Sequence, residues 1–131
     1  YLPPNFEPVA AAGKFQLVDD DTEILAGIHL RLTPGHVPWH QAVLLRDRGE
    51  TVAFIADLIP TSSHLRLPWI MGYDLEPLRT LETKRALLAD AMAGGWRLVF
   101  EHDPVMAMAR VVQQGRSARL ADTVEIVAPR G

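Results

Sequence analysis

Three residues whose side chains can bind a metal stand on a turn or just past a predicted strand. His36 lies on a Pro/Gly turn, Asp57 closes the predicted strand 51–56, and His102 closes the predicted strand 97–101. Imidazole and carboxylate are the usual ligands of catalytic zinc, at about 2.0–2.2 Å. Because these side chains are short, ligands that are distant in sequence must be presented from rigid strand ends. We therefore predict that the three residues converge on a metal.

Each of these residues also has a purely structural alternative. His36 could be an ordinary turn histidine, and His102 a strand-end histidine with its hydrogen bonds satisfied. Asp57 could end its strand and cap the turn before Pro60, a common role for aspartate. The chain has no cysteine. Any metal must therefore be held by histidine and carboxylate.

Two further polar residues are candidates for orienting the ligands. His40 follows His36 by four residues, a spacing that would put both on one face of a helix. Gly35 and Pro38 disfavour a helix there, so a His-x3-His metal pair is not predicted. We expect His40 to donate a hydrogen bond that orients a ligand or the loop, and we assign Asp103 the same kind of role.

The segment 58–77 is a long irregular connection with three prolines and a glycine. Long loops in compact domains are usually functional or disordered, and the aromatic residues here favour a packed lid or pocket wall. His64 could line a pocket or contact substrate, or it could be an exposed loop histidine. Tyr73 and Trp69 could form an aromatic pocket wall, or they could pack the loop onto the sheet.

The bulk composition excludes several classes of protein. A length of 131 residues suffices for one domain, and 48% hydrophobic with 22% charged residues is ordinary for a globular protein. The net charge of −3 gives no basic field, so no nucleic-acid partner is expected. No apolar run approaches the roughly 18 residues that cross a bilayer, so we expect no membrane partner. Separately, we expect a cytoplasmic protein. Because the chain begins with Tyr1, we expect a processed or truncated protein.

Local patterns predict several strands and one main helix. Residues 1–13 have a proline-rich start and are predicted to be an extended connector. The helix is predicted over 80–93, with Thr80 as N-cap and a Gly-Gly stop after it. The almost wholly apolar strand 51–56 is expected to be buried on both faces, as in a central strand. The predicted strands are 14–18, 23–25, 28–32, 41–45, 51–56, 97–101, 106–113 and 119–127. This order predicts an α/β (α+β) fold with mostly antiparallel strands, as a single domain or half-domain over 1–131.

The local sequences around the three candidate ligands resemble those of a known family. The segments "TPGH", "FIADLIPTS" and "FEHDP" occur in that order and contain His36, Asp57 and His102. They resemble the C-terminal half of a metallo-β-lactamase-fold hydrolase, over about Asn5 to Val127. The family's first-half motif, His-x-His-x-Asp-His, is absent from the sequence. The resemblance therefore implies the C-terminal half of a four-layer αβ/βα sandwich.

The resemblance also implies a role for each candidate ligand. The family uses the residue in the position of His36 as the last ligand of a first metal. The residue in the position of Asp57 bridges both metals, and the one in the position of His102 completes the second. Two Zn²⁺ ions are expected in a complete site, although Fe or Mn would suit the same ligands. The implied reaction is hydrolysis of a small-molecule ester, lactone, thioester or phosphoester through a metal-bound hydroxide.

The missing first half has its own consequence. Three protein ligands split between two metals hold a dinuclear centre poorly, so we expect this chain alone to be inactive. Activity would require the N-terminal half, supplied by another segment or another copy. The alternative is a non-catalytic half-domain that dimerises or binds a partner chain through its exposed inner sheet face. A flavoprotein partner domain of the same fold is disfavoured, because nothing in the sequence supplies a flavin site.

Overall fold

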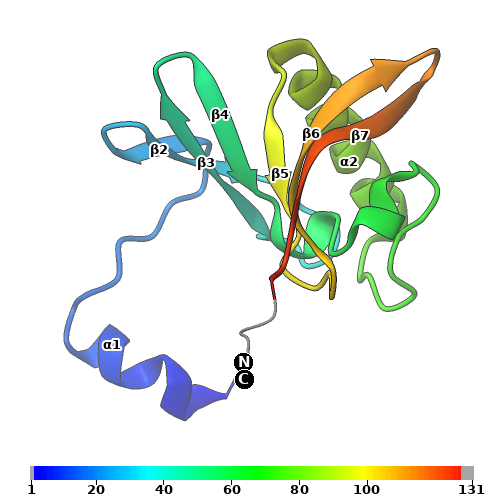
Figure 1. Ribbon diagram of the computed structural model, residues 1–131. Helices are drawn as coiled ribbons and strands as arrows, with labels where there is room; N and C mark the ends of the chain where they lie inside the picture. The colour runs from blue at the N-terminus through cyan, green and yellow to red at the C-terminus, as the bar shows by residue number, and fades with distance from the viewer. Residues whose placement is uncertain (1, 128–131) are drawn as a thin grey trace.

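Seven strands follow one another in chain order across a single sheet (Figure 1). The computed structural model describes residues 2–127. All neighbouring strands pair antiparallel except β4 and β5, which are parallel. The predicted class, mixed α/β with mostly antiparallel strands and one main helix, is confirmed. The strands are β1 (Thr22–Leu25), β2 (Ile28–Leu32), β3 (Gln41–Asp47), β4 (Glu50–Phe54), β5 (Arg97–Val99), β6 (Met106–Gln114) and β7 (Ser117–Glu125).

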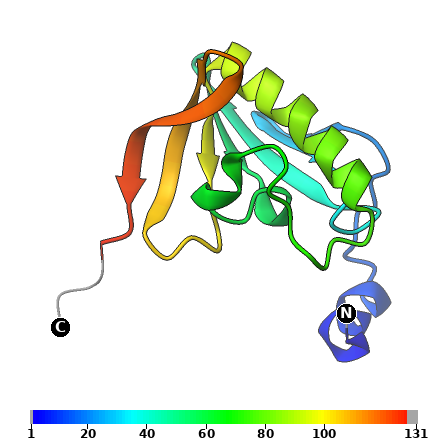
Figure 2. The same ribbon diagram turned by 90° about the vertical axis from the view of Figure 1, so that its right-hand side faces the viewer.

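The long helix α2 (Pro77–Gly94) lies against one face of the sheet and connects β4 to β5 (Figure 2). Parallel neighbours cannot be joined by a tight turn, so a crossover of this kind is required. The helix begins before the predicted N-cap, with Pro77 in its first turn. Proline is tolerated there because an N–H in the first turn has no acceptor within the helix. The prediction of Thr80 as N-cap is wrong: its N–H donates to the carbonyl of Glu76 at 2.9 Å. The helix ends at Gly94 and is capped by Gly95, whose φ of 61° suits glycine.

Between β4 and α2 the chain forms two short 3-10 turns, η2 (Ala56–Leu58) and η3 (Ser62–Leu65). Side chains on alternate positions of the strands pack under α2 and these turns. Among residues 2–127, no helix combines the length and apolar character needed to cross a membrane. The buried core is formed by Ala42, Leu44, Ala53, Ile55, Leu58, Ile59, Leu65, Leu87, Leu88, Ala91, Trp96, Leu98, Phe100, Ala109 and Val111.

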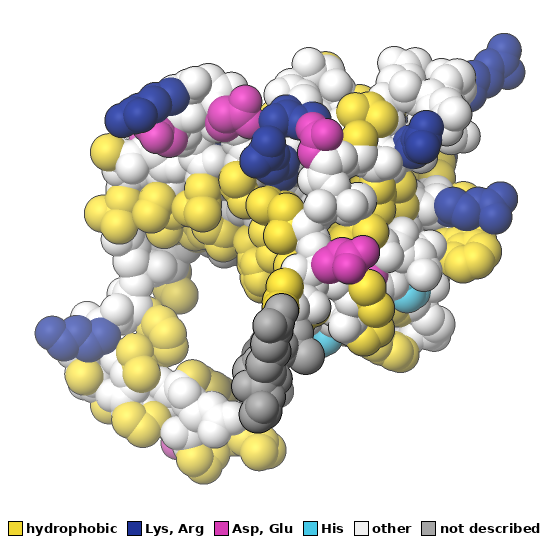
Figure 3. Space-filling model, in the orientation of Figure 1, with side chains coloured by type: hydrophobic (Ala, Val, Ile, Leu, Met, Phe, Trp, Pro, Cys, Tyr) yellow, Lys and Arg dark blue, Asp and Glu magenta, His cyan; other side chains and the backbone are white. Residues whose placement is uncertain are grey.

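The opposite face of the sheet is apolar and is not covered by the helix. Phe54 of β4 is 37% exposed on this face, while its neighbour Ala53 is fully buried under α2. The prediction that this strand is buried on both faces is therefore wrong, although its central position in the sheet is confirmed. Figure 3 shows hydrophobic side chains in a band across the molecule. One row of this face pairs in register across six strands: Leu30, Val43, Phe54, Val99, Met108 and Val124.

The N-terminal segment differs from the prediction in two ways. The extended connector expected over 1–13 contains the 3-10 helix η1 (Pro3–Asn5) and the short helix α1 (Glu7–Ala11) instead. Each begins with a proline in its first turn, where the missing N–H costs nothing. The strand expected over 14–18 does not form, because β1 pairs only with β2 and leaves this segment without a partner strand. Its apolar residue Leu17 is 89% exposed.

The strands predicted over 41–45 and 51–56 form one hairpin, and those predicted over 106–113 and 119–127 form another. Strands β3 and β4 are joined through Arg48 and Gly49, which both have positive φ, at 46° and 82°. Two positive φ values suit the two-residue turn whose twist matches that of the strands. Strands β6 and β7 are joined around Gly115, whose φ is 60°. These hairpins set the register of the sheet on both sides of the parallel pair.

The strand directions bring three chain segments to one edge of the sheet. Because β2 and β4 are both antiparallel to β3, they run in the same direction, and β5 runs parallel to β4. The carboxyl ends of β2, β4 and β5 therefore lie at the same edge. The segments that leave these ends carry His36, Asp57 and His102.

The turn that carries His36 requires glycine at position 35. Gly35 has φ 141°, and a Cβ at this position would lie 2.4 Å from the backbone of Thr80 in α2. We expect Gly35→Ala to lower the free energy of unfolding by roughly 1–3 kcal/mol, because the turn and the helix must separate. Urea unfolding followed by circular dichroism measures this. Gly49→Ala is the matched control: its φ is also positive but its surroundings are open, so the loss should be about 1 kcal/mol. Equal losses would contradict the proposed clash.

Candidate metal site

Asp57 lies between the two histidines predicted to be metal ligands. Its Oδ1 is 3.1 Å from Nε2 of His102, and its Oδ2 is 3.4 Å from Nε2 of His36. The two carboxylate oxygens thus face two different imidazoles. The structure therefore brings the three predicted residues together, with the carboxylate in the middle.

The backbone before Asp57 is strained. Ala56 has φ 45°, a left-handed conformation that alanine rarely adopts. Such a residue costs of the order of 1–3 kcal/mol and persists only where the surroundings impose it. It turns the chain out of β4 into η2, which carries Asp57. The N–H of His102 donates to the carbonyl of Pro60 at 3.1 Å and ties the second histidine to the same connection.

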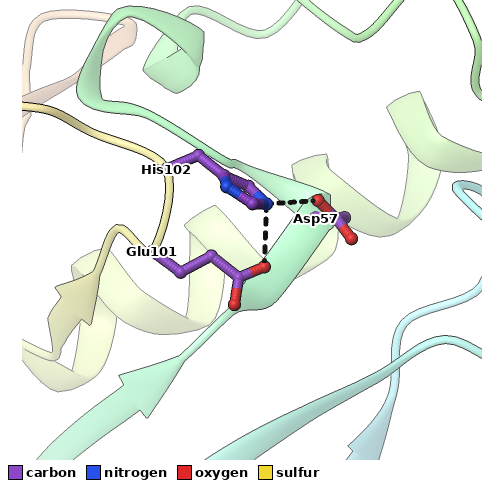
Figure 4. Close-up of side chains that lie close together, drawn as sticks. All are labelled: Asp57, Glu101 and His102. Atoms are coloured by element: carbon purple, nitrogen blue, oxygen red, sulfur yellow. Dashed lines mark hydrogen bonds and ion pairs between the residues drawn. The ribbon is translucent and has the colours of Figure 1, made fainter.

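Glu101 adds a carboxylate that the sequence analysis did not single out. Its Oε1 is 3.3 Å from Nε2 of His102. Ligand atoms of Asp57, Glu101 and His102 all lie within 4.8 Å of one another (Figure 4). In the sequence, Glu101 is adjacent to His102, and this was the only available signal. An acidic residue next to a histidine is too common to predict a site.

Asp74 holds the other nitrogen of His36 and was also missed. Its Oδ1 is 2.9 Å from Nδ1 of His36, and its side chain is 1% exposed. The backbone N–H of Leu75 donates to the carbonyl of His36 at 3.1 Å, so side chain and backbone fix the same residue. A carboxylate on one imidazole nitrogen orients the ring and directs the other nitrogen to a metal. Here that other nitrogen, Nε2, is the one that faces Asp57.

His40 is buried beside His36. Among the described contacts it forms no ion pair with Asp57, unlike His36 and His102. Its Nδ1 is 2.7 Å from the hydroxyl of Thr33, and its ring meets the ring of His36 edge-on, with centroids 5.9 Å apart. Its Nε2 is buried without a hydrogen-bond partner among the described residues. Burial and the neighbouring His36 lower the pKa of His40, so the neutral ring is favoured.

A cavity of about 340 Å³ opens beside His102. His64 and Tyr73 both line it, and the Tyr73 ring lies edge-on to His36 with centroids 6.0 Å apart. Nδ1 of His64 is 2.7 Å from the hydroxyl of Thr61. Trp69 is 48% exposed and does not line this cavity. The segment predicted to be a lid or pocket wall therefore contributes His64 and Tyr73 to the space beside the candidate ligands.

Asp103 fixes the loop after β5 to the loop after β4. Its Oδ2 accepts hydrogen bonds from the N–H and the hydroxyl of Ser62, and its Oδ1 accepts from the N–H groups of Val105 and Met106. Desolvation alone would raise the pKa of Asp103, but these hydrogen bonds to the charged form outweigh it and hold the pKa well below the usual range. Asp103 therefore joins the segments that carry Asp57 and His102.

The donor set fits a metal ion. Imidazole nitrogens and carboxylate oxygens suit zinc, iron or manganese. Asp74 occupies Nδ1 of His36 and leaves Nε2 available. The two oxygens of Asp57 face in different directions, which suits a carboxylate shared between two ions. His36, Asp57 and His102 are therefore the candidate ligands, with Glu101 beside them.

Comparison with known proteins identifies the family. The family model of the metallo-beta-lactamase superfamily matches residues 2–102. The chain therefore belongs to the metallo-beta-lactamase superfamily. A comparison with curated protein sequences gives no significant match.

Solved structures share the fold at low sequence identity. A probable metal-dependent hydrolase from Staphylococcus aureus is similar with a TM-score of 0.78 and 20% identity, covering 91% of this chain and 42% of that one. AidC, described as a dizinc quorum-quenching lactonase, gives a TM-score of 0.72 and 18% identity, covering 90% and 42%. The hydrolase AbOPH gives 0.73 and 22%, covering 90% and 41%. The chain thus spans about two fifths of the length of these proteins.

The hydrogen bonds of Asp103 predict an acid-dependent loss of stability. A carboxyl whose pKa falls on folding stabilises the protein above its unfolded value, near 3.9, and this contribution is lost as the pH falls toward the folded value. We expect Asp103→Asn to lower the free energy of unfolding at pH 7 by about 2 kcal/mol, because an amide cannot accept all four bonds. Urea unfolding at several pH values should show the difference from wild type shrinking below about pH 4. The exposed Asp47→Asn is the control, and a pH-independent difference would contradict this account.

The contact between Asp74 and His36 predicts an effect on metal affinity. We expect Asp74→Asn to weaken metal binding by about 10- to 100-fold, because the charge that orients and polarises the imidazole is lost. Competition with a chromophoric chelator, using the protein in its active assembly, measures the dissociation constant. Asp90→Asn removes from α2 a carboxylate that pairs with Arg31 of β2, and it should leave the affinity unchanged. An unchanged affinity in Asp74→Asn would rule out the orienting role.

Proposed function

We propose that this chain is the C-terminal part of a metal-dependent hydrolase with a dinuclear, zinc-type site. The observation that carries the proposal is the position of Asp57, whose two oxygens face His36 and His102 separately. Family membership and the hydrolase neighbours support the same reaction class. Bound metal ions would supply an activated water and would polarise the substrate.

The residues of this chain would have distinct tasks in that site. His36 would hold one ion through Nε2, kept in orientation by Asp74. His102 would hold the other, and Asp57 would join the two and help to set their separation. His40 and Asp103 would position the turn and the loop that carry the ligands. His64 and Tyr73 would contact the substrate in the cavity beside His102.

The substrate class that this site supports best is a small ester or lactone. The cavity combines apolar walls from Ile70 and Met71 with the polar groups of His64 and Tyr73. Small-molecule sites commonly combine apolar walls with a few placed polar groups. One structural neighbour is described as a lactonase and another as an N-acyl homoserine lactone hydrolase, both with the product N-hexanoyl-L-homoserine bound. A thioester or phosphoester is the alternative, because the metal chemistry is common to all of them.

A partner segment would complete the site. The His-x-His-x-Asp-His motif is absent from this sequence, so the ligands present would be shared between two ions without enough donors for either. The uncovered sheet face, with Phe54 37% and Leu45 46% exposed, is apolar surface that a partner would bury. We therefore propose that an N-terminal half packs on this face and supplies the remaining ligands. The same face favours the second candidate function, a non-catalytic half-domain that dimerises.

Native mass spectrometry of the protein from its natural source, together with a hydrolysis assay, tests the proposal. We expect a species with two metal ions and a segment that bears the missing motif, and turnover of esters or lactones that a chelator abolishes. Asp57→Asn should lower kcat/KM by roughly a hundredfold or more, because a shared ligand is lost. Asp90→Asn should leave it unchanged. The 14.5 kDa chain should show no turnover with added metal.

The alternative outcomes are distinct. A metal-free homodimer of this chain without turnover would support the non-catalytic half-domain. Clear turnover by the isolated chain with added metal would contradict the need for a second half. Turnover that is insensitive to chelation and to Asp57→Asn would contradict the metal site itself.

A further inference from the structure

Lys84 is a fully buried charged residue near the candidate site. It lies on α2 with 0% of its surface exposed. Its Nζ donates hydrogen bonds to three backbone carbonyls, those of His64, Arg66 and Trp69, the last two at 2.7 Å. All three acceptors belong to one connection, which wraps around the ammonium group. An ammonium has three N–H donors, so its hydrogen-bonding capacity is filled.

This arrangement needs the charged form of the side chain. A neutral amine would leave one of the three carbonyls without this donor, and an apolar side chain would leave all three without it. Burial lowers the pKa of Lys84 to about 8, against an opposing contribution from Asp74. The ammonium therefore predominates at neutral pH. Burying a charge is unfavourable unless its hydrogen bonds are satisfied, and the carbonyls satisfy them here.

The connection held by Lys84 forms the wall of the substrate-side cavity. His64 and the stretch from Ile70 to Tyr73 line that cavity. The far end of the same connection is fixed independently: the N–H groups of Leu75 and Glu76 donate to the carbonyls of His36 and Gly35. The cavity wall is thus fixed at two places. One is the set of hydrogen bonds from Lys84, and the other is the backbone contact with the turn that carries His36.

We propose that Lys84 is a positioning residue that sets the shape of the substrate cavity by fixing residues 64–69 to α2. Lys84 would not touch the substrate or a metal. Because the wall is fixed at two places, the effect of Lys84 is separate from that of Asp74, which acts on His36. Loss of Lys84 should loosen the wall near His64 and leave the turn that carries His36 in place.

Limited proteolysis tests this role directly. Trypsin cleaves after Arg66, whose carbonyl belongs to the scissile bond and accepts a hydrogen bond from Lys84. In the intact protein we expect Lys84→Met to speed this cleavage by about tenfold or more, because the released carbonyls favour local opening. Cleavage after Arg97, within β5, should keep its rate and is the internal control for unfolding of the whole domain.

Chemical rescue shows whether the ammonium group itself, and not the length of the side chain, protects the bond after Arg66. The chain has no cysteine, so Lys84→Cys provides a single thiol. Alkylation of the unfolded variant with 2-bromoethylamine, followed by refolding, rebuilds an amine of nearly the original length. Alkylation with 2-bromoethanol gives a neutral side chain of the same length and is the matched control. We expect the aminoethyl form, and not the hydroxyethyl form, to recover wild-type protection after Arg66.

A kinetic readout deepens the proposal and rests on the proposed hydrolase function. With an ester or lactone that the wild type cleaves, Lys84→Met should raise KM by about tenfold and change kcat and metal content less, because the wall binds substrate and the ligands stay in place. Unchanged cleavage after Arg66, or equal rescue by both alkylating agents, would overturn the positioning role. A wild type without turnover would overturn the hydrolase function, whereas the cleavage and rescue results would still decide the role of Lys84.

Discussion

The parallel pairing of β4 with β5 is the constraint on which the candidate site depends. In a sheet of consecutive antiparallel strands, β5 would end at the edge opposite β4, and His102 would lie a strand length away from Asp57. The parallel pair brings both residues to one edge, together with His36 after β2. It also requires a crossover. That crossover contains α2 and the connection before it, so the parallel pair accounts for about half of the described residues that lie outside the strands.

The crossover contributes more than a return path for the chain. It presents Asp57 at its start, orients His36 through Asp74, and fixes its own middle to α2 through Lys84. The contacts made by Asp74 and Lys84 are polar, and both of these side chains are buried. Such contacts are costly when incomplete, so they specify one arrangement of the connection more sharply than apolar packing would. The site is therefore built from the same contacts that order the loop.

The sequence predicted the features that depend on local pattern. The Pro/Gly turn before His36, the hairpin around Gly49 and the apolar strands that precede Asp57 and His102 are all readable from neighbouring residues. The convergence of Asp57 and His102 was predicted from their ligand chemistry at strand ends and from the resemblance to the family, because no periodicity fixes the direction in which β5 pairs. The exposure of Phe54 was mispredicted for a related reason. An apolar sequence shows that a strand can be buried, but it does not show whether one or both faces of the sheet are covered.

Two of the residues that sequence reasoning missed, Asp74 and Lys84, act across long separations. Asp74 contacts His36, which lies 38 residues earlier in the sequence, and Lys84 donates hydrogen bonds to carbonyls that lie 15 to 20 residues earlier. On a helix whose other charged residues face solvent, Lys84 has the appearance of one more surface charge. Its burial is decided by the path of the connection, which has no regular pattern of its own. Residues 14–18 show the converse: they have the alternating pattern of a strand, but no strand forms there because no other strand pairs with them.

The uncovered sheet face and the candidate site are linked by the strands they share. Phe54 precedes Asp57 by three residues, and Val99 precedes His102 by three. Both Phe54 and Val99 belong to the apolar row that crosses the sheet. A polypeptide packed on this row would be held a few residues from the ligands, and its own side chains would reach them without a separate docking surface. The hydrophobic face would then supply the affinity, and the edge formed by β2, β4 and β5 would supply the chemistry.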